Sequence, residues 1–152
     1  MTTCIETITT LNNKAAEVLK GYEVHAATDV TGFGLGGHAL EMAEGSGVTL
    51  HIQIDDVLVL DEALAMYDMG VTTGSNANNR ALIASATRFE RDLPGKQGEI
   101  FVDPQTSGGL LVALPEAQAS AALATLHDTG VAAAHIVGHV RQLERADHLV
   151  FR

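Results

Sequence analysis

One carboxylate stands at the mouth of a glycine-rich turn between an expected strand and an expected helix. Asp29 follows a short apolar strand over 24–28, and the apolar residues after the turn repeat with the spacing of one helix face. Gly32 and Gly34 lack the Cβ atoms that would hinder a sharp turn and a close approach to a ligand. The start of the helix offers unpaired N–H groups that attract anions, whereas Asp29 alone would repel them. This combination predicts a divalent cation such as Mg²⁺ that bridges Asp29 to phosphate oxygens.

Two other interpretations of the same turn stay open. The stretch 32–37 satisfies G-x-G-x-x-G, and Asp55 or Asp56 follows about twenty residues later, as in a dinucleotide-binding module whose acid binds a ribose. Asp29 argues against that module, because it stands just before the turn, where a pyrophosphate must lie close to bare backbone. In the third interpretation the glycines serve the turn alone, and Asp29 caps the helix that follows.

The other residues with reactive or metal-binding side chains form weaker patterns. Of seven histidines, only His135 and His139 stand four apart, in an expected strand, so no zinc site is expected. Cys4 has no basic neighbour and is interpreted as an incidental free thiol. One further polar group could form a lip around a ligand, although helix capping explains it as well: Gly74, Asn76, Asn78, Asn79 and Arg80.

Composition limits the kinds of partner. The 152 residues are 46% hydrophobic, enough for one domain with a core and too few for two ordinary ones. Nine Lys and Arg against nineteen Asp and Glu give a net charge of −10, which opposes nonspecific binding to nucleic acid or to an anionic membrane. The apolar stretches are too short for a membrane span. A single cysteine and no basic leader predict a cytoplasmic protein.

The elements that must position Asp29 interleave without βαβ regularity. Residues 1–10 are threonine-rich and poorly patterned, and 11–152 are interpreted as one domain. The loop 103–109, dense in turn formers, joins two expected strands. The expected helices are 11–19, 35–43, 61–69, 76–86 and 116–126, and the expected strands are 24–28, 48–54, 99–102, 110–114, 135–140 and 149–151. We therefore expect an α+β fold with a mixed β-sheet flanked by helices.

Two motifs together resemble one enzyme family. The segments 27–35 (ATDVTGFGL), 37–38 (GH) and 103–111 (DPQTSGGLL) look like the carboxyl-terminal half of the selenophosphate synthetases, also called selenide, water dikinases. That half belongs to the aminoimidazole ribonucleotide synthetase superfamily, so the resemblance implies its C-terminal-domain fold. The chain departs from the family at Gly36, where leucine is common.

The resemblance implies a function and a set of partners. Such enzymes convert ATP, selenide and water to selenophosphate, AMP and phosphate, with Mg²⁺ neutralising the triphosphate. Asp29 matches the family's magnesium ligand in this half, Gly32 and Gly34 would close against the nucleotide, and no residue here matches a catalytic one. The resemblance further implies a homodimer and a separate N-terminal domain with the reactive cysteine or selenocysteine. We therefore expect these residues alone to be inactive and to bind metal weakly.

Overall fold

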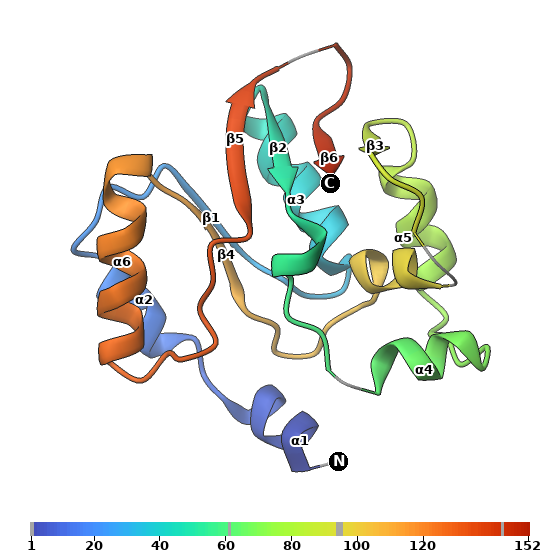
Figure 1. Cartoon of the computed structure of the whole chain (residues 1–152), viewed down its shortest axis with the longest axis horizontal. Coiled ribbons are helices and arrows are strands. Elements are labelled where there is room, and N and C mark those ends of the chain that lie inside the picture. Colours follow the sequence, from blue (N-terminus) through green and yellow to red (C-terminus); the bar gives the residue numbers. More distant parts are fainter. Residues whose placement is uncertain (1, 61, 94–95, 144) are drawn as a thin grey trace.

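The chain forms two β-sheets (Figure 1). Asp29 ends a strand of the smaller sheet, whereas the hydrophobic core packs against the larger one. The computed structural model describes residues 2–60, 62–93, 96–143 and 145–152. In chain order the elements are α1 (Thr2–Thr9), α2 (Asn13–Leu19), β1 (Ala26–Asp29), α3 (Gly34–Ser46), β2 (Val48–Ile52), η1 (Ile54–Asp56), α4 (Ala63–Asp68), α5 (Asn76–Ile83), β3 (Thr87–Phe89), η2 (Gln97–Val102), β4 (Leu110–Ala113), α6 (Glu116–Asp128), β5 (Gly138–Gln142) and β6 (Leu149–Phe151), where η marks a 3-10 helix.

The larger sheet is mixed, with strand order β3-β6-β2-β5. Strand β2 runs parallel to β6 and antiparallel to β5, and β3 runs parallel to β6. Helices α3 and α5 and the 3-10 helix η2 pack together beside this sheet. The mixed sheet flanked by helices confirms the α+β fold expected from the sequence.

The core lies between this sheet and α3. Ala39 and Ala43 of α3 are fully buried, and their small side chains let the helix approach β2 and β6 closely. Phe101 of η2 and Phe151 of β6 are also buried, with ring centroids 4.5 Å apart. A Cβ on Gly36 would lie 2.9 Å from the Phe101 carbonyl oxygen, so the departure from leucine at this position suits the close packing of α3 on η2.

The smaller sheet pairs β1 with β4 antiparallel, so that Asp29 lies opposite Leu110. Helices α2 and α6 pack against each other on this side of the molecule (Figure 1). The Tyr22 hydroxyl joins this region to α6 through a hydrogen bond of 2.7 Å with the Thr125 hydroxyl. The pairing with β4 fixes β1, and with it the start of the glycine-rich turn.

Several sequence predictions need correction. Residues 99–102, expected to be a strand, lie in the 3-10 helix η2, which turns Glu99 toward α5 while burying Phe101 and Val102. The strand expected from residue 135 begins at Gly138. A Cβ on Gly138 would lie 1.9 Å from the His51 carbonyl oxygen, so glycine is required for this close pairing with β2. The alternation in 48–54 indicated a half-buried strand, but β2 lies between two strands and is buried from Thr49 to Ile52.

Short elements at the edges were not predicted. The poorly patterned start forms the exposed helix α1, and the three-residue strand β3 was missed. The remaining expected helices and strands are present, with ends shifted by a few residues. Asp61, the first residue of the expected helix 61–69, lies outside the described residues.

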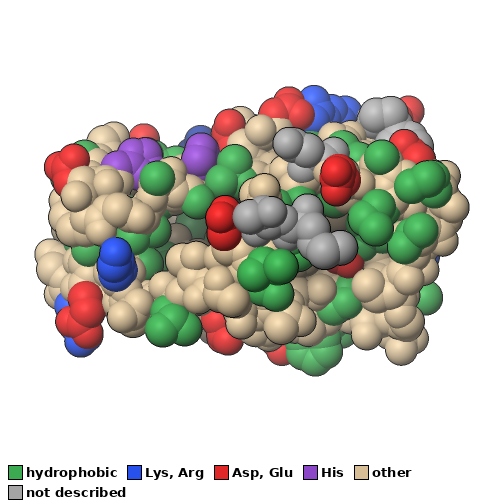
Figure 2. All heavy atoms as spheres, turned by 90° about the horizontal axis from the view of Figure 1, so that it is seen from below, with side chains coloured by type: hydrophobic (Ala, Val, Ile, Leu, Met, Phe, Trp, Pro, Cys, Tyr) green, Lys and Arg blue, Asp and Glu red, His purple; other side chains and the backbone are tan. Residues whose placement is uncertain are grey.

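One face of the molecule exposes apolar side chains. Figure 2 shows hydrophobic side chains gathered on its right-hand side, the side on which α4 lies in Figure 1. Met69 is 73% exposed and Leu58 is 61% exposed, and Met66 and Val71 are also exposed. Extended apolar surface of this kind is typical of contacts with other protein surfaces.

Candidate functional site

Asp29 is exposed at the end of β1. Among the described residues its carboxylate accepts no hydrogen bond and forms no ion pair, while the next residue, Val30, donates its N–H to the Gly109 carbonyl at 2.9 Å. The helix α3 begins after Phe33 without a side-chain cap, so Asp29 does not cap it. The capping interpretation is therefore wrong, and the carboxylate is available to a ligand.

The two candidate glycines differ in what surrounds them. Gly34 is buried with φ of 69°, and a Cβ there would lie 2.8 Å from the Asp103 carbonyl oxygen, so its type is required by the backbone and by packing. Gly32 is exposed, and a Cβ added to it would have no atom of the described residues within 4 Å. Only Gly32 therefore presents open backbone on the outer side of the turn.

The second sequence motif lies directly against the first. Gln105 donates its backbone N–H to the Thr31 carbonyl at 3.0 Å. A Cβ on Gly108 would lie 1.9 Å from the Val30 carbonyl oxygen, so only glycine allows the two chains to approach this closely. Asn12 donates its side-chain amide to the Gly108 carbonyl at 2.8 Å. The fold thus brings together two motifs that are far apart in sequence.

A network of polar side chains inside the protein holds Asp103, the first residue of the second motif, 103–111. Tyr67 of α4 donates its hydroxyl hydrogen to Asp103 Oδ1, and the other Asp103 oxygen accepts from Gln105 Nε2 at 2.9 Å. Asn76 donates to Glu99 Oε2 at 2.9 Å and to the Tyr67 hydroxyl at 3.2 Å. Desolvation, reinforced by the hydrogen bond to Asp103, raises the pKa of Tyr67 to about 12.

This network revises the polar lip expected from the sequence. Asn76 and Asn79 are 2% and 4% exposed, so they support the site from inside rather than line a ligand surface. Arg80 forms an ion pair with Glu99, and Asn78 is exposed. Tyr67 and Glu99 escaped sequence reasoning because a lone tyrosine in a helix and a glutamate in an expected strand give no pattern.

A shallow groove of about 190 Å³ opens beside the turn, lined by Thr31, Gly32, Phe33 and His38. The Phe33 ring is 46% exposed and lies 5.4 Å from the His38 ring, measured between centroids. His38 is held on both sides, because Nε2 lies 3.1 Å from the Thr31 hydroxyl and Nδ1 lies 3.1 Å from Glu41 Oε2. The groove places a polar edge and an aromatic face next to the open side of Gly32.

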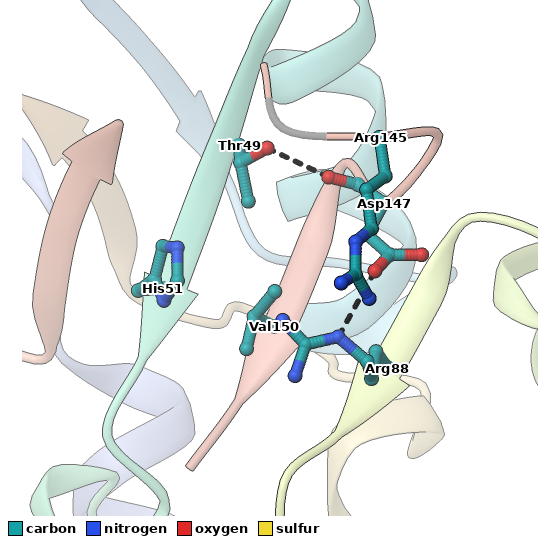
Figure 3. Close-up of a pocket in the computed structure, with 6 residues that line it drawn as sticks. All are labelled: Thr49, His51, Arg88, Arg145, Asp147 and Val150. Atoms are coloured by element: carbon teal, nitrogen blue, oxygen red, sulfur yellow. Dashed lines mark hydrogen bonds and ion pairs between the residues drawn. The ribbon is translucent and has the colours of Figure 1, made fainter. Parts of the chain in front are cut away.

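A second pocket of about 210 Å³ lies on the four-stranded sheet (Figure 3). It is lined by Thr49, His51, Arg88, Arg145, Asp147 and Val150. Arg88 Nε donates to Asp147 Oδ2 at 2.9 Å, and Thr49 donates to the Asp147 carbonyl at 2.7 Å. Arg88 and Asp147 are thus already engaged in internal contacts, which connect β2 and β3 to the residues just before β6.

The dinucleotide interpretation is wrong for this fold. A dinucleotide fingerprint requires the strand before the glycines and the next strand to lie in one parallel sheet, whereas β1 and β2 belong to different sheets. Asp55, one of the two proposed ribose ligands, pairs instead with Arg91 at 2.5 Å. This ion pair lowers the pKa of Asp55, chiefly through its hydrogen bond with the guanidinium.

The described residues contain no preformed metal centre and no membrane helix. Within 2–60, 62–93, 96–143 and 145–152, no group of three or more His, Cys, Asp or Glu side chains could hold a metal ion. None of the helices in the same ranges is long and apolar enough to cross a bilayer. A cation at Asp29 would therefore need oxygen ligands from phosphate, water or another domain.

Comparison with known proteins gives consistent results. A model of the family described as AIR synthase related protein, C-terminal domain, matches residues 3–149. Selenide, water dikinase 2 of Peptoclostridium acidaminophilum is 42% identical over 140 residues, which cover 92% of this chain and 40% of that protein. Selenide, water dikinase of Pelobacter propionicus is 40% identical over 136 residues, covering 90% and 39%. This chain thus spans about two fifths of the length of these relatives.

A solved structure shows the same fold. The crystal structure of hydrogenase maturation protein HypE aligns with a TM-score of 0.59 and 21% identity, covering 90% of this chain and 35% of that protein. HypE in complex with ATP aligns with the same TM-score and covers 34% of that chain. At this identity the likeness concerns the fold alone.

Proposed function

Because the chain belongs to the family of AIR synthase related protein C-terminal domains, we propose that it is the C-terminal domain of an ATP-dependent selenophosphate synthetase. In this proposal it supplies Asp29 to a nucleotide site shared with another domain. The full enzyme would convert ATP, selenide and water to selenophosphate, AMP and phosphate.

The observation that carries the proposal is the meeting of the two motifs at Asp29, whose exposed carboxylate has no hydrogen-bond or ion-pair partner among the described residues. Asp29 offers carboxylate oxygens, and Mg²⁺ is usually bound by one or two carboxylates together with phosphate oxygens and water. Bound there, Mg²⁺ would neutralise charge on the triphosphate. The fit of this donor to the ion supports the assignment of Asp29 as a metal ligand.

The backbone of the turn supports a phosphate ligand. No described residue accepts a hydrogen bond from the N–H groups of Gly32 and Phe33, and both residues are exposed. Unpaired N–H groups before a helix attract anions. Since the chain carries a net charge of −10, these local donors must offset a general repulsion of ATP. Gly32 is the proposed point of approach, and Gly34 shapes the turn from behind.

Other parts of the proposal concern the missing partners. The relatives are more than twice as long as this chain, which supports a second domain that completes the ATP and selenide sites. The exposed apolar side chains around α4 are consistent with such a contact. We further propose a cytoplasmic homodimer of the complete enzyme, with no role for nucleic acid or membrane.

A chimera tests the proposal. The N-terminal part of the Peptoclostridium acidaminophilum enzyme is joined to this chain in place of its own C-terminal domain, and AMP formation is measured with and without selenide. The proposal expects selenide-dependent AMP formation that the N-terminal part alone does not support. A folded chimera with no selenide-dependent activity would refute it.

A further inference from the structure

Asn79 joins the glycine-rich turn to the second motif from inside the protein. It lies on α5 and is 4% exposed. Its side-chain nitrogen donates to the Gly32 carbonyl at 2.9 Å and to the Val102 carbonyl at 3.0 Å. An asparagine amide carries two N–H donors, so both are used.

These bonds are not part of a helix cap. The backbone N–H of Asn79 bonds the Ser75 carbonyl at 3.0 Å within the first turn of α5, and the side chain reaches the glycine-rich turn and the end of η2. A buried amide is costly unless its hydrogen bonds are made, so the side chain holds both carbonyls in fixed positions. One carbonyl belongs to the turn after Asp29, and the other directly precedes Asp103.

The orientation of one peptide unit follows from this contact. The peptide bond between Gly32 and Phe33 is planar and trans, so its C=O and N–H point in opposite directions. With the Gly32 carbonyl turned inward to Asn79, the Phe33 N–H is turned outward. That N–H has no acceptor among the described residues, and the space on the outer side of Gly32 is open.

We propose that Asn79 is a positioning residue for the nucleotide site: by holding the Gly32 carbonyl inward, it presents the Phe33 N–H to a phosphate group of ATP. This inference rests on the proposed function for the identity of the ligand. The orientation of the turn by Asn79 does not depend on which ligand binds, and it can be tested in this chain alone.

The first test measures amide hydrogen exchange by NMR in this 152-residue chain. Asn79→Ala removes both donors, and Asn79→Leu keeps a side chain of similar size without donors. Asn78→Ala, one residue earlier and exposed, is the matched control. The diagnostic amides are those of Gly34 and Gln105, which both donate to the Thr31 carbonyl, at 2.9 and 3.0 Å.

If Asn79 holds the turn, both Asn79 variants speed exchange at Gly34 and Gln105 by at least about tenfold, and Asn78→Ala does not. The N–H of Leu50, which bonds the His148 carbonyl at 2.9 Å in the core, reports on global stability. Equal acceleration at Leu50 and Gly34 would show a merely structural role and overturn the proposal, as would unchanged exchange at Gly34.

The second test uses steady-state kinetics of the chimera. Loss of the Asn79 donors is expected to raise the KM for ATP about tenfold and to leave the KM for selenide unchanged, because about 1.4 kcal/mol of phosphate binding is lost. Asn78→Ala should change neither. An unchanged KM for ATP, or equal changes in both, would overturn the positioning role. An inactive parent chimera would instead count against the proposed function, while the exchange experiment still decides the role of Asn79.

Discussion

The Val30 carbonyl oxygen lies so close to Gly108 that a Cβ on residue 108 would be only 1.9 Å from it. The two motifs can therefore meet only because residue 108 is glycine. Each motif is ordinary turn sequence when taken alone. Pressed together, they hold Asp29 at the surface beside backbone donors.

Replacing Gly108 should therefore separate the motifs. Gly108→Ala is expected to lower the free energy of unfolding by about 2 to 4 kcal/mol, because the methyl group collides with backbone that cannot swing aside. Urea denaturation followed by circular dichroism measures the change. Gly109→Ala is the control, since a Cβ at this position would have no neighbour within 4 Å in the part of the chain that the structure describes. Equal stability of the two variants would contradict the close approach.

Alanine at Gly34 should destabilise the fold much more than alanine at Gly32. Gly34→Ala is expected to cost about 2 kcal/mol or more, because φ of 69° is strained for alanine and its Cβ would press on Asp103. Gly32→Ala should leave the free energy of unfolding within about 1 kcal/mol of the parent. Urea denaturation measures both variants. A larger loss of unfolding free energy for Gly32→Ala than for Gly34→Ala would contradict the role of Gly34 in the fold of the turn.

Tyr67 should make stability depend on alkaline pH. Its pKa is raised from the usual 10 to about 12, so between these values the native state keeps a proton that the unfolded state has lost. The contribution is complete below about pH 10 and is lost as pH rises through about 12. Urea unfolding at about pH 9 and about pH 11 should show falling stability in the parent and a weaker fall in Tyr67→Phe. A pH dependence unaltered in Tyr67→Phe would argue against the Tyr67–Asp103 contact.

NAD should not bind this chain saturably. The strands that flank the 32–37 glycines lie in separate sheets, and Asp55 is occupied by Arg91. Isothermal titration with NAD measures the interaction. A defined binding isotherm that Asp55→Asn abolishes would restore the dinucleotide interpretation.

The sequence sufficed for features that depend on local chemistry. The expected turn formers at 103–109 lie between η2 and β4, and Asp29 lies at the end of β1 as expected from the apolar run before it. Most helix positions followed from apolar spacing. Two of these helices are followed by glycines with positive φ, Gly70 at 83° and Gly130 at 90°, a common way for a helix to end.

Features that depend on distant contacts were beyond single-sequence reasoning. Glu99 is followed by the apolar run Ile100, Phe101 and Val102, which is typical of a strand. Its carboxylate instead contacts Asn76 and Arg80, and the segment forms a 3-10 helix. The role of Gly34 also depends on a distant partner, Asp103, which no local pattern reveals. Asn79 looked like a helix-start residue, and only the folded chain shows that it connects the glycine-rich turn to the end of η2.

The most direct measurement compares Asp29→Asn with Asp56→Asn in the chimera by selenide-dependent AMP formation and by thermal unfolding. Both are exposed aspartates at the surface, so the second controls for the loss of one charge. Asp29→Asn is expected to lower activity by about a hundredfold or more with an unchanged melting temperature, since a metal contact is worth several kcal/mol. Asp56→Asn should keep parental activity. Full activity in Asp29→Asn would contradict the metal role of this carboxylate.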